Sequence, residues 1–193
     1  MRDVKNNFYA VVLICLFIVV GFMALPMRAQ AIEPKITDIL ITNNKENVLL
    51  YARLVNGFKP EMELAILAGI PAIFTLQLEV HQERSFIWNK KITSHEIKRT
   101  IKYDNLKKTF SLYTNGNQQP VIFSDFESAQ KAMSDFNGIN AAPLASLVKG
   151  KNYYVLIKVK MDKVRLPLNM EYVFSFVSFW DFETAWYQQN FSY

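Results

Sequence analysis

Two histidines and their neighbouring carboxylates are the residues whose types and spacing could support chemistry. Glu79, His81 and Glu83 occupy alternate positions, so in a strand they lie on one face, where they could hold a metal ion. The same alternation is typical of the solvent face of an amphipathic strand, and His95 is the only other histidine. We therefore expect neither a metal site nor a bound cofactor.

Nucleophilic catalysis has weak support in the sequence. Ser85, Ser94 or Ser111 would have to meet a histidine without a Gly-x-Ser-x-Gly motif to present the hydroxyl. The single cysteine, Cys15, lies in the apolar N-terminal segment, and the chain has no glycine-rich phosphate loop. We expect no catalytic residues, and a hydrolase is the least supported interpretation.

Basic side chains concentrate between residues 84 and 108. They could form a contact surface for an acidic partner or anionic lipid. The alternative is the solvated face of two or three strands. The candidate contact residues in this stretch are Arg84, Lys90, Lys91, Lys98, Arg99 and Lys102.

Aromatic residues crowd the C-terminal region. Phe174 and Phe176 have the period of two that a strand needs to face a core. Trp180, Trp186 and Tyr187 are candidates either for core packing or for an exposed contact surface, because Trp and Tyr combine an apolar ring with a polar atom. The other members of this cluster are Phe179, Phe182, Phe191 and Tyr193.

Short segments with alternating apolar residues predict a mainly β fold. The clearest runs from Phe74 to Glu83, with four apolar side chains on one face. The remaining expected strands are 36–42, 48–54, 99–103, 109–113, 120–123, 153–161 and 172–180, and residues 85–91 continue a strand or turn into the next.

Two short helices interrupt these strands. Pro60–Ala68 starts with proline and stops before Gly69, which suits a helix start and end. Ser124 and Glu127 have capping-box spacing and begin a helix that continues to Phe136. Residues 139–150 are expected to form a loop. The predicted fold is an antiparallel β-sandwich, immunoglobulin-like or a curled sheet, with two helical insertions and a preceding hydrophobic helix.

The N-terminal segment predicts export from the cytoplasm. Arg2 and Lys5 precede an apolar run over residues 8–25, and Ala29-Gln30-Ala31 follows Pro26. The small-residue site favours a cleaved signal peptide, whereas a helix of about 27 Å nearly matches a bilayer and favours a retained single-pass anchor. Both interpretations divide the chain into residues 1–31 and an exported β-rich domain, residues 32–193.

Export also limits the partners. The exported part has 19 Lys and Arg against 16 Asp and Glu, and it lacks cysteine, so it contains no disulfide. Ile14 before Cys15 disfavours lipidation of that cysteine. We expect a periplasmic or extracytoplasmic location, with the domain either free or anchored in the inner membrane by residues 8–25. We expect an unidentified envelope protein as partner and no nucleic-acid partner.

Seven short motifs follow one another along the chain. They are Tyr51-Ala52-Arg53-Leu54, Asn56-Gly57-Phe58, Ala68-Gly69-Ile70-Pro71, Tyr103-Asp104-x-Leu106, Gly150-x-x-Tyr153, Leu166-Pro167-Leu168 and Phe182-Glu183-Thr184-Ala185-Trp186-Tyr187. In this order they resemble a bacterial family, the domain of unknown function 4390, over about residues 36–191. The resemblance implies an uncharacterised exported or anchored domain and supplies no catalytic residues. Some members of that family resemble neighbours of sensor-kinase systems in gene order.

These observations favour a cell-envelope protein with a non-enzymatic interaction or structural domain. The alternative is a small-ligand sensor linked to envelope signalling, with a cleft beside one of the two helices.

Overall fold

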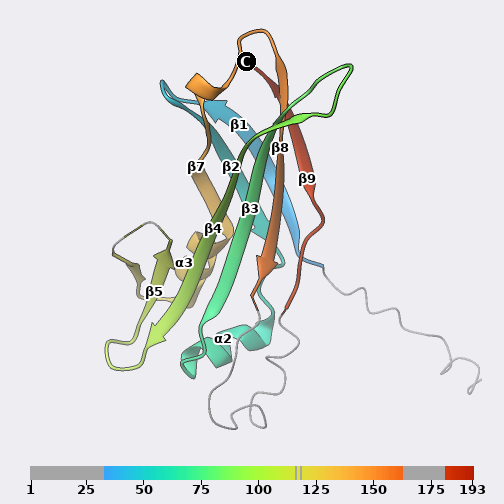
Figure 1. Cartoon of the computed structure of the whole chain (residues 1–193). Helices are drawn as coiled ribbons and strands as arrows, with labels where there is room; N and C mark the ends of the chain where they lie inside the picture. The colour runs from blue at the N-terminus through green and yellow to red at the C-terminus, as the bar shows by residue number, and fades with distance from the viewer. Residues whose placement is uncertain (1–32, 116, 118, 163–180) are drawn as a thin grey trace, which may run out of the picture. The chain divides into compact units, whose positions relative to one another are not determined.

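The computed structural model describes residues 33–115, 117, 119–162 and 181–193. These residues are mainly β, with antiparallel sheets and two α-helices, as expected (Figure 1). Residues 33–193 group into one unit. The expected N-terminal hydrophobic helix and the expected strand 172–180 lie outside the described residues.

The smaller sheet has the strand order β1-β2-β7. Its members are β1 (Lys35–Asn43), β2 (Asn47–Val55) and β7 (Asp135–Pro143). The predicted hairpin of β1 and β2 is confirmed. Its turn forms because the Asn44 side-chain oxygen accepts N–H bonds from Glu46 at 2.8 Å and Asn47 at 2.7 Å.

The larger sheet has the order β6-β5-β4-β3-β8-β9. Strand β3 confirms the predicted alternation, because Phe74, Leu76, Leu78 and Val80 are all buried. Its neighbours β4 and β8 pair with it over nearly its full length. The strands are β3 (Ala72–Gln82), β4 (Lys90–Asp104), β5 (Thr109–Thr114), β6 (Val121–Phe123), β8 (Asn152–Met161) and β9 (Tyr187–Ser192).

Strands β4 and β9 differ from the sequence prediction. β4 begins at Lys90, well before the expected start at residue 99, because its first half pairs with β3 although polar residues obscure its alternation. β9 was not expected and pairs with β8 at the sheet edge. Both strands therefore form mainly because they pair with a neighbouring strand, β3 for β4 and β8 for β9, and less because of their own sequence patterns.

The two helices are confirmed as α2 (Pro60–Leu67) and α3 (Phe126–Ser134). The predicted cap of α3 is wrong: Asp125, one residue after Ser124, accepts the N–H of Ser128 at 2.8 Å. Backbone hydrogen bonding by Ser128 lowers the pKa of Asp125. A carboxylate at this position also stabilises the helix, because its negative charge lies beside the positive end of the helix dipole.

The predicted continuation of α3 to Phe136 is wrong, and the predicted loop at 139–150 is wrong for residues 139–143, which belong to β7. The chain instead enters β7 at Asp135. Phe136 pairs with Ala52, and Ile139 pairs with Leu50, so β7 satisfies the free edge of β2. Gly138, with φ +66°, supplies a backbone conformation that favours glycine within this strand.

The inward faces of both sheets contribute to one hydrophobic core. Leu50 and Leu54 from β2 belong to the same buried cluster as Leu76 from β3 and Ile157 from β8. The Thr93 hydroxyl of β4 donates to the Ala141 carbonyl of β7 at 2.7 Å, which joins the sheets at one margin.

Three connections meet at one end of the domain, which we call the apex end. They are the β1–β2 turn (residues 44–46), the β3–β4 loop (residues 83–89) and the segment between the 3₁₀ turn η1 (Leu144–Ser146) and β8. Leu144 N–H donates to the Glu46 carbonyl at 2.7 Å, and Glu83 N–H donates to the Asn152 carbonyl at 2.9 Å. Figure 1 shows the three connections together at the top.

Candidate functional site

The histidine–carboxylate pattern forms an ion-pair cluster on the outer face of the larger sheet. Glu79 accepts from Lys91 Nζ at 2.6 Å and lies 2.8 Å from His81 Nε2. The imidazole also stacks on Tyr154, with ring centroids 5.0 Å apart. Hydrogen bonds from Lys91 and then His81 lower the pKa of Glu79.

His81 and His95 lie on opposite faces of the sheet. His81 is paired with Lys91, whereas His95 is paired with the buried Leu78, and residues directly opposite one another share a face. In the described part of the chain, no group of three or more His, Cys, Asp or Glu side chains could hold a metal ion. The Glu79–Lys91 ion pair joins β3 to β4.

Replacing Glu79 by glutamine is expected to reduce stability at neutral pH but not in strong acid. The folded-state pKa of Glu79 is lowered, so its ion pairs stabilise the fold above the unfolded value of about 4.3, and that contribution disappears as pH falls through the folded pKa. Melting temperatures of wild type and Glu79→Gln should converge between about pH 7 and about pH 3. The melting temperature of Lys91→Met should converge with that of wild type in the same way, whereas Lys90→Met, which leaves the ion pair intact, should show no such convergence. Melting temperatures of Glu79→Gln and wild type that differ by the same amount at every pH would contradict the prediction.

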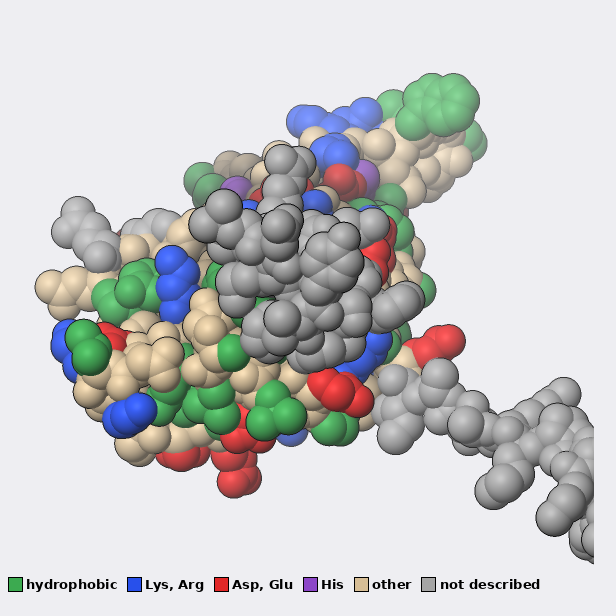
Figure 2. Space-filling view, turned by 90° about the horizontal axis from the view of Figure 1, so that it is seen from below, with side chains coloured by type: hydrophobic (Ala, Val, Ile, Leu, Met, Phe, Trp, Pro, Cys, Tyr) green, Lys and Arg blue, Asp and Glu red, His purple; other side chains and the backbone are tan. Residues whose placement is uncertain are grey.

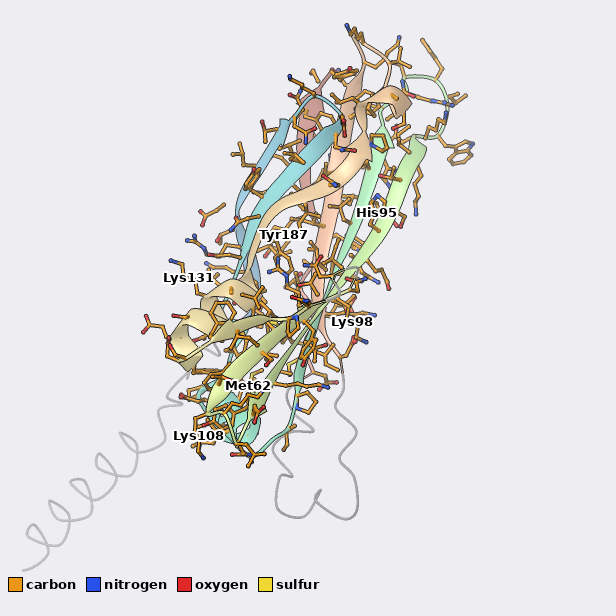
Figure 3. The ribbon with its side chains drawn as sticks, turned by 90° about the vertical axis from the view of Figure 1, so that its left-hand side faces the viewer. Met62, His95, Lys98, Lys108, Lys131 and Tyr187 are labelled. Carbon is orange, nitrogen blue, oxygen red and sulfur yellow. The ribbon has the colours of Figure 1, made fainter. Side chains whose placement is uncertain are left out.

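The predicted basic surface is divided among separate places. Arg84, Lys90 and Lys91 lie at the apex end, where Lys91 is held by Glu79. Lys98 lies midway along the sheet, where it pairs with Asp162 at 2.9 Å, and Figure 3 shows Lys108 near the other end. Lys102 Nζ lies 5.6 Å from the centroid of the Tyr113 ring. The basic stretch is thus not one continuous contact surface.

Arg99 is not a surface residue, which corrects its place among the predicted contacts. It is only 8% exposed, because its position on β4 faces inward opposite Phe74. Its Nη1 donates to the carbonyls of Ala132 at 2.8 Å, Met133 at 3.3 Å and Asp135 at 2.8 Å. Burial lowers its pKa to about 10, so the guanidinium remains charged at neutral pH and holds the end of α3.

The C-terminal aromatic residues separate into buried and exposed members. Phe182 packs against Phe74, with ring centroids 5.6 Å apart. Tyr187 is partly buried, whereas Trp186 is 43% exposed, and its ring lies 4.7 Å from Lys158 Nζ. Trp180 lies outside the described residues.

The β3–β4 loop, residues 83–89, presents three consecutive exposed apolar side chains. We call it the apex loop. Phe86 is 99% exposed, Ile87 60% and Trp88 93%. Such a cluster on a loop is unusual because large apolar side chains are normally withdrawn from water. This site was not predicted from the sequence. The three apolar residues between Arg84 and Lys90 were a usable signal, because they lie where either a strand continuation or a turn was expected.

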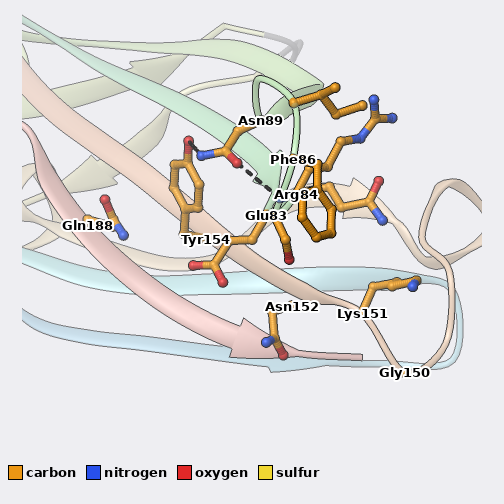
Figure 4. A pocket seen from close by; sticks show the side chains of 12 residues that line it. Glu83, Arg84, Phe86, Asn89, Gly150, Lys151, Asn152, Tyr154 and Gln188 are labelled. Carbon is orange, nitrogen blue, oxygen red and sulfur yellow. Dashed lines mark hydrogen bonds between the residues drawn. The ribbon is translucent and has the colours of Figure 1, made fainter.

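Asn89 fixes the shape of the apex loop. Its side-chain oxygen accepts the Arg84 N–H at 3.1 Å, and its side-chain nitrogen donates to the Tyr154 hydroxyl at 3.2 Å. One amide thus closes the base of the loop and attaches it to β8, as the dashed lines in Figure 4 show. The apolar tip consequently projects from a base that is bonded on two sides.

An open hollow of about 980 Å³ lies beside the apex loop. Its wall includes Phe86 and Ile87 from the loop and Tyr154 from β8. Amide side chains line much of the rest, and Figure 4 shows Asn89, Asn152 and Gln188 around this space. The hollow thus combines apolar surface with hydrogen-bonding groups.

Exposed charges at the apex end are predominantly positive. Two acids, Glu46 and Glu83, accompany six bases in or beside the three connections: Lys45, Arg84, Lys90, Lys91, Lys149 and Lys151. Figure 2 views the domain from the other end, where acidic and basic side chains are interspersed among apolar ones. The apex end therefore combines an apolar tip with a basic surround.

No helix within the described ranges has the length and apolar character needed to cross a membrane.

Comparison with known proteins assigns the chain to a family. No curated protein and no solved structure matches the chain significantly. The sequence model of one family matches residues 31–190, which is nearly the whole of the described domain. The chain therefore belongs to the family described as a domain of unknown function (DUF4390).

Proposed function

We propose that this chain is an exported cell-envelope protein that acts by binding rather than by catalysis, and that the apex loop is its docking element. The observation that carries this proposal is the exposure of Phe86, Ile87 and Trp88 on one loop. Binding sites commonly occupy loops that a rigid scaffold positions. Here β3 and β4 supply the scaffold, and Asn89 fixes the base of the loop.

Export of the domain is part of the same proposal. The basic start, the apolar run at residues 8–25 and the Ala29-x-Ala31 site support a signal peptide or membrane anchor. Because an exported domain meets envelope components and not nucleic acid, we expect the exposed apolar tip to bind a partner in the envelope. We also infer that the two sheets pack as an immunoglobulin-like sandwich, because residues from both occur in one core cluster.

Site-specific photocrosslinking in intact cells tests the docking role. A photoreactive residue at position 88 is expected to give envelope crosslinks, because Trp88 is 93% exposed on the apex loop. The matched control is position 106, since Leu106 is 95% exposed in the turn after β4. Equal or weaker crosslinking at position 88 than at position 106 would contradict the proposal.

A small-ligand sensor is the second candidate. The hollow of about 980 Å³ beside Tyr154 favours it, because its mostly polar lining could orient a small polar ligand against the Phe86, Ile87 and Tyr154 side chains. A smaller hollow of about 440 Å³ lies beside both helices and is lined by Phe58, by Pro60 of α2 and by Phe126 of α3. Stabilisation by a small molecule that is lost in Tyr154→Ala would favour the sensor over the docking function.

A further inference from the structure

We propose that the surface recognised by the apex loop is an anionic lipid bilayer, into whose interface Phe86, Ile87 and Trp88 insert. This inference rests on the proposed docking function and specifies its partner. Trp is enriched where membranes meet water, and its ring suits the headgroup region. Phe and Ile are apolar side chains that gain free energy on leaving water.

The charges around the tip match an anionic bilayer. Arg84 and Lys90 flank the apolar side chains, and Lys149 and Lys151 lie on the neighbouring connection. Long basic side chains can place their apolar stems beside the membrane while their charged groups reach phosphates. Lys91 contributes less, because it is already paired with Glu79. This arrangement pairs apolar insertion with electrostatic attraction, the two terms that bind proteins to membrane surfaces.

The size of the tip favours a bilayer over a protein partner. A stable protein interface covers about 800 Å² on each partner. Phe86 and Trp88 together supply about 300–500 Å², at about 150–250 Å² for each aromatic side chain. A projecting tip of this size can enter a lipid interface without a matching socket or a broad surrounding contact.

The fixed base of the loop reduces the cost of insertion. Asn89 ties the loop both to the Arg84 N–H and to Tyr154. Binding by a loop that already has its bound shape loses less conformational entropy. The same bonds hold the base of the loop, on which Phe86, Ile87 and Trp88 are exposed.

A fluorescent probe on the apex loop tests insertion in the full chain. Cys15→Ser removes the only native cysteine, and Ile87→Cys then places an environment-sensitive probe while retaining both aromatic side chains. The protein is reconstituted in vesicles of phosphatidylcholine alone or with about one third phosphatidylglycerol. We expect a blue shift and quenching by lipid-attached quenchers in the anionic vesicles, with both effects weakened by high salt.

Two control variants make the result specific. Leu106→Cys places the probe on another exposed apolar residue, next to Lys107 and Lys108, and its probe should remain in water. In the Ile87→Cys chain, Arg84→Gln combined with Lys90→Gln should lower the ratio of membrane-inserted to uninserted loop by about 25-fold, at about fivefold for each basic residue near the surface.

Several outcomes would overturn the lipid inference. An unquenched probe at position 87 in both vesicle types would do so, as would equal quenching at positions 87 and 106. If position 88 nevertheless crosslinks to a protein in cells, the docking function stands and the partner is a protein. If crosslinking also fails, both proposals fall.

Discussion

Replacing Arg99 by methionine is expected to lower the free energy of unfolding by about 3–5 kcal/mol. The guanidinium donates to three carbonyls where α3 meets β7, those of Ala132, Met133 and Asp135. It also lies 4.5 Å from the centroid of the Phe136 ring. Methionine fills part of the volume but donates no hydrogen bond, so carbonyls at the negative end of the helix lose their partner.

Thermal unfolding measures this effect. For a domain of this size, each kcal/mol corresponds to about 2–4 °C, so the melting temperature should fall by roughly 10 °C. Lys98→Met is the matched control on the same strand, because the half-exposed Lys98–Asp162 pair should contribute at most about 1 kcal/mol. Similar losses in both variants would show that Arg99 does not hold the α3–β7 junction.

Replacing Tyr153 by alanine is expected to cost about 3–5 kcal/mol, because a large core ring would be replaced by a cavity. Tyr153 is fully buried and stacks on Phe191 of β9, with ring centroids 5.5 Å apart. Its hydroxyl accepts the Val148 N–H at 2.8 Å. The residue therefore joins the core, the edge strand and a connection at the apex end.

Two companion variants separate these roles. Tyr153→Phe keeps the ring and removes the hydrogen bond to Val148, so it should cost only about 1 kcal/mol. Tyr154→Ala alters the next residue, which faces outward, and should mainly loosen the apex loop through loss of the Asn89 contact. Denaturant unfolding would measure the stability of Tyr153→Ala and Tyr153→Phe, and limited proteolysis near residue 88 would detect a loosened apex loop in Tyr154→Ala. Equal stability losses in Tyr153→Ala and Tyr153→Phe would contradict this assignment.

The fold was predictable where each strand carried its own pattern. The alternation of apolar residues in β3 was sufficient, because one face of that strand enters the core. The junction of α3 and β7 was not predictable in the same way. The segment after Phe136 has weak periodicity, and it becomes a strand because β2 offers a free edge. Long-range pairing thus overrides local preference there.

The candidate site was predictable only in part. The sequence identified Arg84, Lys90 and Lys91, which do lie at the apex end. It also placed Arg99 with them, because charge alone does not reveal that this strand position faces inward. The apolar tip was missed because apolar residues next to a strand are ordinarily assigned to that strand. Only the position of the β3–β4 connection shows that they are exposed.

The pairing of β3 with β8 has a consequence for the rate of folding. Gln82 is paired with Tyr153 and Phe74 with Met161, so the centre of the larger sheet joins segments that are far apart in sequence. Domains dominated by such contacts fold in about milliseconds to seconds, much more slowly than helical bundles. For a chain that is exported unfolded, this delay would be useful. The centre of the larger sheet cannot form until the segment containing β8 has reached β3.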